Sequence, residues 1–231
     1  MKRFYKEAQV SPAGDGFAVL LDGRSVKTPM RAALTLPTLA LAEAVAGEWR
    51  AQGEEINPHA MPLTKLANTA IDRVTGHEAQ AIEQIMAYAN DLLCYRAAAP
   101  ADLVVRQAVA WDPLLDWAAG HFGARLSVRT GVKHFIQPQG AVASLRRAVE
   151  ALDTVLLAPL HNAATILGSL VLTLAMAEGR LPAREAFAVS QLDDRYQAEH
   201  WGEDLEATQL AQLLEAELAS AERFIGLART A

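Results

Sequence analysis

The sequence predicts an α+β fold, with a small N-terminal domain of antiparallel strands and one helix, followed by a larger, mainly α-helical domain. Two observations carry this prediction. The dipeptide Asp22-Gly23 lies between an apolar run at 17–21 and an alternating segment at 24–28, a pattern typical of a β-hairpin. From Pro58 onward apolar residues recur at helical spacing, with proline and glycine between the segments. We therefore expect a small domain at 1–58 and a helical domain at 59–231.

The N-terminal domain is expected to be built from strands between residues 3 and 36, including a further strand at 33–36. Pro37 should open a helix at its first turn, and that helix should run to about Gly53. The residues Leu41, Val45 and Trp49 recur at four-residue spacing, so one face of the helix can lie on the sheet.

In the helical domain we expect Thr64 to cap one helix and residues 77–90 to form a second. Asp112-Pro113 should act as N-cap and first-turn proline, splitting 103–122 into two helices that meet near Trp111 and Trp117. Residues 123–138 should form an extended excursion, for which the small sheet is one available partner. Further helices are expected at 139–157, 159–178, 182–200 and 203–227.

The last of these helices is strongly amphipathic, because its apolar residues keep to one helical face. They are Leu210, Leu213, Leu214, Leu218, Ala221, Phe224 and Ile225.

Length and composition limit the classes of partner. With 231 residues, 52% of them hydrophobic, the chain can bury a sizeable core. A formal net charge of -6 argues against a nucleic-acid partner, which would require clustered Lys and Arg. The single cysteine, Cys94, has apolar neighbours and is interpreted as a buried structural residue.

Segment 154–177 has no charged side chain and raises the question of a membrane span. Pro159, His161 and Asn162 interrupt its apolar run, so we expect a buried core helix and no stable membrane insertion. His161-Asn162 is explained as a helix start set by Pro159. The N-terminus has no apolar export segment, which favours a cytoplasmic location in a bacterium. If the source is eukaryotic, the mitochondrial matrix is expected, although no transit peptide is present.

No motif for catalysis, metal binding or cofactor binding is found in the sequence. The glycine-rich phosphate loops are absent, and none of the six histidines has a neighbour at metal-ligand spacing. We therefore expect no catalytic residues, no metal and no cofactor.

The stretch at 190–207 carries the strongest functional signal. Its carboxylates could serve acid–base chemistry in a small hydrolase-like enzyme that uses the cluster at 199–206, but such work needs carboxylates in unlike environments. Binding is the alternative that we favour, because aromatic anchors and carboxylates together suit a basic protein surface. The expected partner-binding residues are Tyr196, Gln197, Glu199, Trp201, Glu203, Asp204 and Glu206. Residue chemistry alone leaves open whether the two aromatic side chains contact a partner or pack inward.

Six segments, taken in order, resemble one family. They are RFYKEAQV (3–10), LDGRSVKTP (21–29), EWRAQGEEINPHAMPLT (48–64), YANDLLCYRA (88–97), QAVAWDPLL (107–115) and LDDRYQAEHWGEDLEA (192–207). The family is the assembly chaperone of the ATP synthase α subunit, known in mitochondria and in α-proteobacteria, and the resemblance spans nearly the whole chain.

The resemblance implies a non-enzymatic protein that binds the unassembled α subunit of F1-ATP synthase and prevents its aggregation until α3β3 assembly. It also implies a small α+β domain joined to a larger helical one. The YQ-x-x-x-WG motif falls on Tyr196, Gln197, Trp201 and Gly202, and the acidic role of the family falls to one of Glu203, Asp204 or Glu206.

A second set of residues is assigned to structure. The EW pair of the family falls on Glu48-Trp49, where Trp49 shares a helical face with Leu41 and Val45. The turn at Asp22-Gly23 and the sequence Trp111-Asp112-Pro113 complete this set. A third hypothesis is a structural module that self-associates through the last helix, by way of Leu213 and Leu218.

Overall fold

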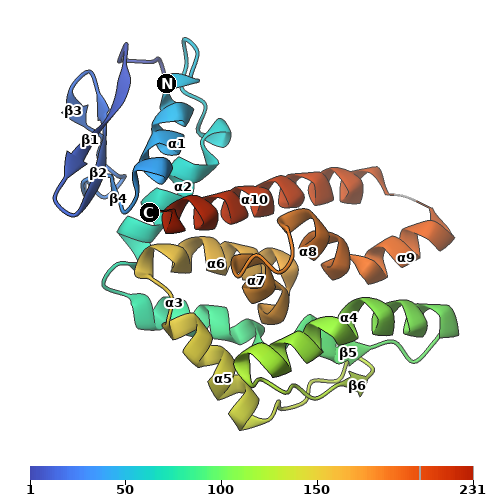
Figure 1. Ribbon diagram of the computed structural model, residues 1–231. Helices are drawn as coiled ribbons and strands as arrows, with labels where there is room; N and C mark the ends of the chain where they lie inside the picture. The colour runs from blue at the N-terminus through green and yellow to red at the C-terminus, as the bar shows by residue number, and fades with distance from the viewer. Residues whose placement is uncertain (203, 231) are drawn as a thin grey trace. The chain divides into compact units, whose positions relative to one another are not determined.

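The computed structural model describes residues 1–202 and 204–230, which form two compact units (Figure 1). The first unit comprises Met1–Gln80, Asp153–Pro159 and the C-terminal segment from Ser220; the second comprises Ala81–Leu152 and Leu160–Ala219. The first unit therefore extends beyond the predicted span 1–58 and takes in two segments that are distant in sequence. Residue 58 as a domain boundary stays a prediction.

An antiparallel sheet occupies the start of the first unit. Strand β1 (Ala8–Ala13) pairs along its whole length with β2 (Gly16–Leu21), and β2 also pairs with β3 (Arg24–Ser25) and β4 (Thr35–Leu36). The turn between β2 and β3 contains Asp22 at φ 47° and Gly23 at φ 77°, the two positive values that a type I′ turn requires. The predicted hairpin is confirmed.

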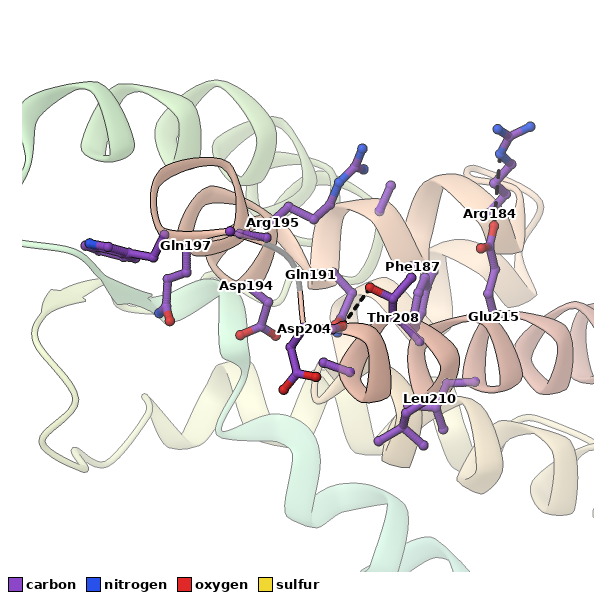
Figure 2. Close-up of a pocket in the computed structure, with 17 residues that line it drawn as sticks. Arg184, Phe187, Gln191, Asp194, Arg195, Gln197, Asp204, Thr208, Leu210 and Glu215 are labelled. Atoms are coloured by element: carbon purple, nitrogen blue, oxygen red, sulfur yellow. Dashed lines mark hydrogen bonds and ion pairs between the residues drawn. The ribbon is translucent and has the colours of Figure 1, made fainter.

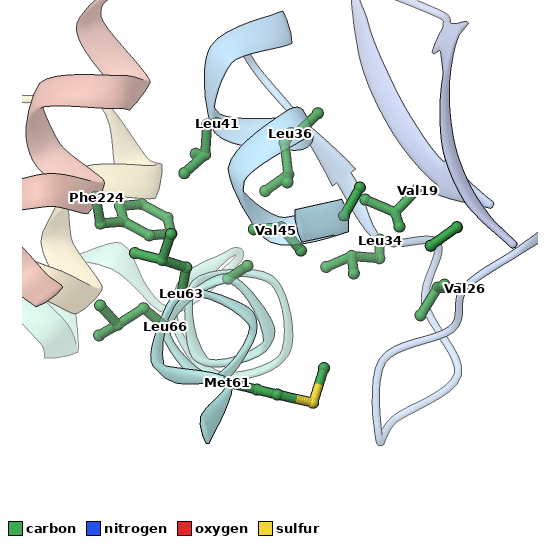
Figure 3. Packing of buried hydrophobic residues seen from close by; sticks show 14 of the residues in the cluster. Val19, Val26, Leu34, Leu36, Leu41, Val45, Met61, Leu63, Leu66 and Phe224 are labelled. Atoms are coloured by element: carbon green, nitrogen blue, oxygen red, sulfur yellow. The ribbon is translucent and has the colours of Figure 1, made fainter. Parts of the chain in front are cut away.

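Helix α1 (Leu39–Arg50) packs on this sheet through one apolar face. Thr38 is its N-cap and accepts a hydrogen bond from the backbone N–H of Leu41, so the helix starts two residues after Pro37 and not at it. The predicted face is confirmed for Leu41 and Val45, which are fully buried. Figure 3 shows both side chains in a cluster with residues of the sheet, of α2 (Pro62–Thr69) and with Phe224.

Glu48 connects α1 to the start of α2. Its carboxylate accepts hydrogen bonds from the backbone N–H groups of Leu63 at 2.7 Å and Thr64 at 2.8 Å, and from the Thr64 hydroxyl at 2.7 Å. First-turn N–H groups have no partner within their own helix, and a carboxylate is the most favourable acceptor there. The prediction that Thr64 caps this helix is wrong, because the helix begins at Pro62 and the capping group comes from another helix.

The neighbouring Trp49 packs against Tyr5. The two rings meet edge to face at 5.7 Å, and the Tyr5 hydroxyl donates to the backbone carbonyl of Trp49 at 2.7 Å. A 3-10 turn at Pro58–Ala60 precedes α2, and a π-helix at Ala70–Val74 follows α2. Helix α3 (Glu78–Met86) follows.

Helices make up most of the second unit, which confirms the predicted fold class. They are α4 (Ala101–Phe122), α5 (Gln139–Glu150), the later part of α6 (Thr154–Leu167), α7 (Leu170–Ala177), α8 (Ala183–Ser190), α9 (Leu192–Trp201) and the first part of α10 (Leu205–Arg229).

Helix α4 is continuous, so the prediction that Asp112-Pro113 divides it is wrong. Pro113 lies on the exposed side, whereas Trp111, Leu114 and Leu115 on either side of it are buried. A proline removes only one hydrogen bond from the helix, and burial of the adjacent turns offsets that loss. Asp112 is not an N-cap; its carboxylate accepts from the Arg96 guanidinium at 2.7 Å.

Pro159 likewise lies inside a helix, α6, so it sets no boundary and His161-Asn162 is not a helix start. The breaks fall elsewhere. Residues 151–153 separate α5 from α6, and Gly168 at φ 62° separates α6 from α7. Ser169 then caps α7 by accepting from the backbone N–H of Leu172 at 3.0 Å.

The predicted excursion at 123–138 is present, but it does not join the N-terminal sheet. Its short strand β6 (Arg129–Thr130) pairs in parallel with β5 (Tyr95–Arg96) in a separate two-stranded sheet. The Gln137 side chain joins the two ends of the excursion, because it hydrogen-bonds to both the backbone N–H and the carbonyl of Ser127.

Asp91 is fully buried and lies against the first turn of α7. Its carboxylate accepts from the backbone N–H groups of Val171 at 2.8 Å and Leu93 at 3.0 Å, while burial raises the pKa of this carboxyl to about 6. Cys94 is also fully buried, as predicted, and burial raises the pKa of its thiol to about 12. Among the described residues, no helix has the length and apolar character needed to cross a bilayer.

Candidate partner-binding groove

Helices α8, α9 and the first part of α10 enclose a groove of about 770 Å³ (Figure 2). Apolar side chains, including Phe187, Leu210 and Leu214, line it together with charged ones. Figure 2 shows Asp194 and Asp204 towards one end and Arg184 facing Glu215 towards the other. The Arg184 and Glu215 charges are 4.0 Å apart, and the Arg184 side chain is 90% exposed, so this pair adds little to stability.

The turn between α9 and α10 gives the groove its shape. Gly202 ends α9 at φ 96° and ψ 158°, a backbone conformation that is adopted almost only by glycine. Asp204 then starts α10, because its carboxylate accepts from the backbone N–H of Glu206 at 2.9 Å and its carbonyl accepts from the N–H of Thr208.

Large apolar side chains are exposed at this turn and along the adjoining part of α10. Trp201 is 77% exposed, and the exposed fractions of Leu205, Leu210 and Leu213 are 75%, 57% and 67%. Single exposed leucines are normal on a protein surface, but a tryptophan and three leucines near one groove form a patch of the kind found at interaction sites. The apolar face predicted for the last helix is therefore covered only in part, because Leu210 and Leu213 are exposed whereas Phe224 is fully buried.

Tyr196, in contrast, points inward and is 4% exposed. Its hydroxyl donates to the Asp102 carboxylate of α4 at 2.9 Å, and the Arg106 guanidinium lies 5.1 Å from its ring centroid. Burial and the Asp102 charge raise the pKa of the Tyr196 hydroxyl. The same hydrogen bond lowers the pKa of the Asp102 carboxyl.

Two of the acidic side chains of α9 also bind α4. The Glu199 carboxylate accepts from Arg106 at 2.6 Å, which lowers the pKa of that carboxyl, and Asp193 accepts from the Gln107 amide at 2.7 Å. Gln107 is buried. These contacts hold α9 against α4, so the carboxylates of Asp193 and Glu199 are engaged in hydrogen bonds within the protein.

The predicted partner-binding residues therefore separate into two groups. Gln197, Trp201 and Asp204 line the groove, and Glu206 is exposed in the first turn of α10. Tyr196 and Glu199 contact α4 instead. Glu203 lies outside the described residues.

Sequence analysis missed several groove residues. Arg184 and Phe187 lie on α8, which no functional motif marked, and Leu210 was named only as part of the apolar face of the last helix. One signal for Leu210 was present in the sequence. The apolar residues of the last helix extend from Ile225 back to Leu205, which is longer than a single buried contact requires.

Neither a catalytic nor a metal site is apparent in the described residues. They hold no group of three His, Cys, Asp or Glu side chains arranged to bind a metal ion. A catalytic acid would need a raised pKa, whereas the pKa of Glu199, at the start of the proposed acidic cluster, is lowered.

Comparison with known proteins identifies the family. The family model described as ATP12 chaperone protein matches residues 2–119, about half of the chain. The chain belongs to the ATP12 chaperone family. The resemblance inferred from the six segments is thus confirmed, and with it the function of a chaperone in ATP synthase assembly. The hydrolase hypothesis finds no support among these relatives.

Individual relatives of this ATP12 chaperone agree over most of its length. Atp12 from Paracoccus denitrificans is 43% identical, with a TM-score of 0.95 over 99% of this chain and 98% of that one. A protein of Agrobacterium tumefaciens described as a candidate chaperone is 40% identical, with a TM-score of 0.94 over 97% and 85%. The mitochondrial protein atp12 of Schizosaccharomyces pombe is 25% identical over 214 residues, covering 87% of this chain and 74% of that protein.

Proposed function

We propose that this ATP12-family chaperone binds the unassembled α subunit of F1-ATP synthase and prevents its aggregation before α3β3 assembly. It does so without catalysis, metal or cofactor, in the bacterial cytoplasm or, in a eukaryote, in the mitochondrial matrix. The observation that carries the proposal is the groove of α8, α9 and α10, where Trp201 and exposed leucines lie near the exposed side chains of Asp194 and Asp204.

The physical demands on such a chaperone match this groove. A subunit that awaits its neighbours exposes apolar surface, and exposed apolar surface promotes aggregation. A chaperone must cover that surface and later release it, which favours a modest interface with a few aromatic anchors and a charged rim. Trp201 and Leu210 supply the apolar contact, and Asp194 and Asp204 supply rim charges that attract a basic surface.

Within this proposal the acidic residues have separate roles. Asp204 and Glu206 face the partner, whereas Glu199 and Tyr196 hold α9 in place by binding α4. Gln197 borders the groove and offers its amide to a backbone group of the partner. Glu48 and Trp49, the turn at Asp22-Gly23 and the Trp111 to Pro113 segment keep structural roles.

Capture of the α subunit tests the proposal. The tagged chaperone is produced together with the F1 α subunit of the same organism, and capture and light scattering of the heated α subunit are measured. We expect stoichiometric capture and suppressed aggregation. Leu210→Asp should reduce both by about tenfold or more, because it places a charge in the apolar contact. Absence of capture by the unaltered chain would refute the proposal.

Matched variants separate contact from folding. Val109→Asp changes another exposed aliphatic residue of the second unit, 73% exposed on α4, and should leave capture unchanged. Asp204→Asn keeps an oxygen that can cap α10 while removing the charge, so it reports on the charge alone. Its control is Asp116→Asn, an exposed carboxylate of α4. Equal losses in the groove variants and in their controls would contradict the placement of the site.

A further inference from the structure

A second cavity in the second unit lies far along the chain from the groove. It has a volume of about 440 Å³ and is lined by the end of α3, the 3-10 turn Ala87–Ala89, the excursion before α5 and the first turns of α5. Most of its wall is apolar, with Met86, Phe135, Ile136 and Val142 among the lining residues. Ile136 is 86% exposed at its edge.

The wall also contains an unsatisfied polar group. The Asn90 side-chain nitrogen donates to the Tyr95 hydroxyl at 2.6 Å and faces His134 Nδ1 at 3.0 Å, while its oxygen is buried without a hydrogen-bond partner among the described residues. Rotation of the carboxamide by 180° would exchange these roles and leave the NH2 group unpaired. In either orientation, one buried amide group in the wall is left without a hydrogen-bond partner among the described residues.

The excursion before α5 carries only positive charges, whereas the Arg146 guanidinium in the cavity wall is already paired with Glu83 of α3. Residues 117–149 contain no Asp or Glu, although the whole chain carries a net charge of -6. Arg125, Arg129 and Lys133 of the excursion are exposed and form no ion pair within the described residues. The Arg129 guanidinium lies 4.9 Å from the ring centroid of Phe135, which places one of these cations at the cavity wall.

The backbone beside the cavity favours an extended occupant. Strand β6 belongs to a sheet that has only two strands in the described part of the chain, so its outer edge has no strand partner there. Both residues of β6, Arg129 and Thr130, are exposed. A free strand edge pairs with an extended peptide, and alternate side chains of that peptide point to the same face.

We propose that this surface binds an extended protein segment that carries acidic and aliphatic side chains in alternation. An aliphatic side chain enters the cavity beside Ile136, the backbone bonds to the β6 edge, and the carboxylates meet Arg129 and Lys133. The surface differs in charge from the groove of α8 to α10, which is lined by Asp194, Asp204 and Glu215 as well as by Arg184 and Arg195. The inference goes beyond the proposed function and does not depend on the identity of the partner.

Fluorescence anisotropy with a labelled synthetic peptide of alternating Glu and Leu tests the inference on the full chain. We expect saturable binding that weakens with salt, and binding weaker by about tenfold or more for the peptide in which Lys replaces Glu. Equal binding of the two peptides would refute the proposal. Tighter binding of a single-stranded oligonucleotide than of the acidic peptide would also refute it. So would light scattering that shows the chain forming a dimer through this surface while the peptide does not bind.

Variants of the chain locate the contact. Ile136→Asp, and the pair Arg129→Glu with Lys133→Glu, should each weaken peptide binding by about tenfold or more. The matched controls Val109→Asp and Arg180→Glu alter exposed residues elsewhere in the second unit and should leave binding unchanged. If the cavity variants bind as the controls do, the proposal is wrong. Because no α subunit is used, this result is independent of the capture experiment.

Discussion

The two ends of helix α10 carry the same apolar pattern and have opposite environments. Towards the C-terminus, Phe224 is fully buried and lies in the core of the first unit with Leu63 and Leu66 (Figure 3). Towards the N-terminus, Leu210 and Leu213 are more than half exposed beside the groove. Helical periodicity identifies an apolar face, but it does not reveal what covers that face. The covered end stabilises the fold, and the uncovered end is exposed to solvent.

The largest expected effect is on stability at the covered end. Phe224→Ala removes a fully buried ring from a packed cluster, and we expect the free energy of unfolding to fall by about 3–5 kcal/mol. Leu213→Ala, at the exposed end, should change it by less than about 0.5 kcal/mol. Urea unfolding followed by circular dichroism measures both. Similar losses in the two variants would show that the exposed end is covered after all.

The same contrast extends to carboxylates, with Asp91 buried and Asp194 exposed. Asp91→Asn replaces an acceptor by an NH2 group that faces backbone N–H donors, so we expect a loss of about 2 kcal/mol at pH 7. Asp194→Asn is the matched control, with a change below about 0.5 kcal/mol.

The pH dependence of this loss has a defined sign. The folded pKa of Asp91, about 6, lies above its ordinary value of 3.8, so between these values the folded chain holds a proton that the unfolded chain has released. The contribution of Asp91 to stability is therefore fully present near pH 4 and declines as the pH rises through 6. The difference between the unaltered chain and Asp91→Asn should grow as the pH falls from 7 to 4; a difference that shrinks would contradict the raised pKa.

The smallest expected effect on stability separates the two aromatic residues of α9. Tyr196→Phe removes the hydrogen bond to Asp102, and we expect a small loss of stability and a rise in the pKa of the Asp102 carboxyl towards its ordinary value. NMR titration of the Asp102 side chain measures this rise. Trp201→Phe should leave that pKa unchanged and reduce capture of the α subunit. If both variants acted alike, the division into an inward and an outward aromatic residue would be wrong.

Local features were predictable from the sequence where local chemistry decides the structure. The hairpin at Asp22-Gly23 was predicted correctly because its positive φ values depend on these two residues themselves. The predictions at Thr64, Pro113 and Pro159 were wrong for the opposite reason. Glu48 caps α2 from another helix, and burial on both sides of each proline keeps α4 and α6 continuous.

For the candidate site, the sequence determined the family, the fold class and the acidic, aromatic character of α9 and its following turn. Only the tertiary structure decided which of those side chains are free. Asp102, Arg106 and Gln107 of α4 lie more than eighty residues away along the chain, and they bind Tyr196, Glu199 and Asp193. They leave Trp201 and Asp204 exposed. No periodicity within α9 can specify this choice, because it depends on a helix distant in the sequence.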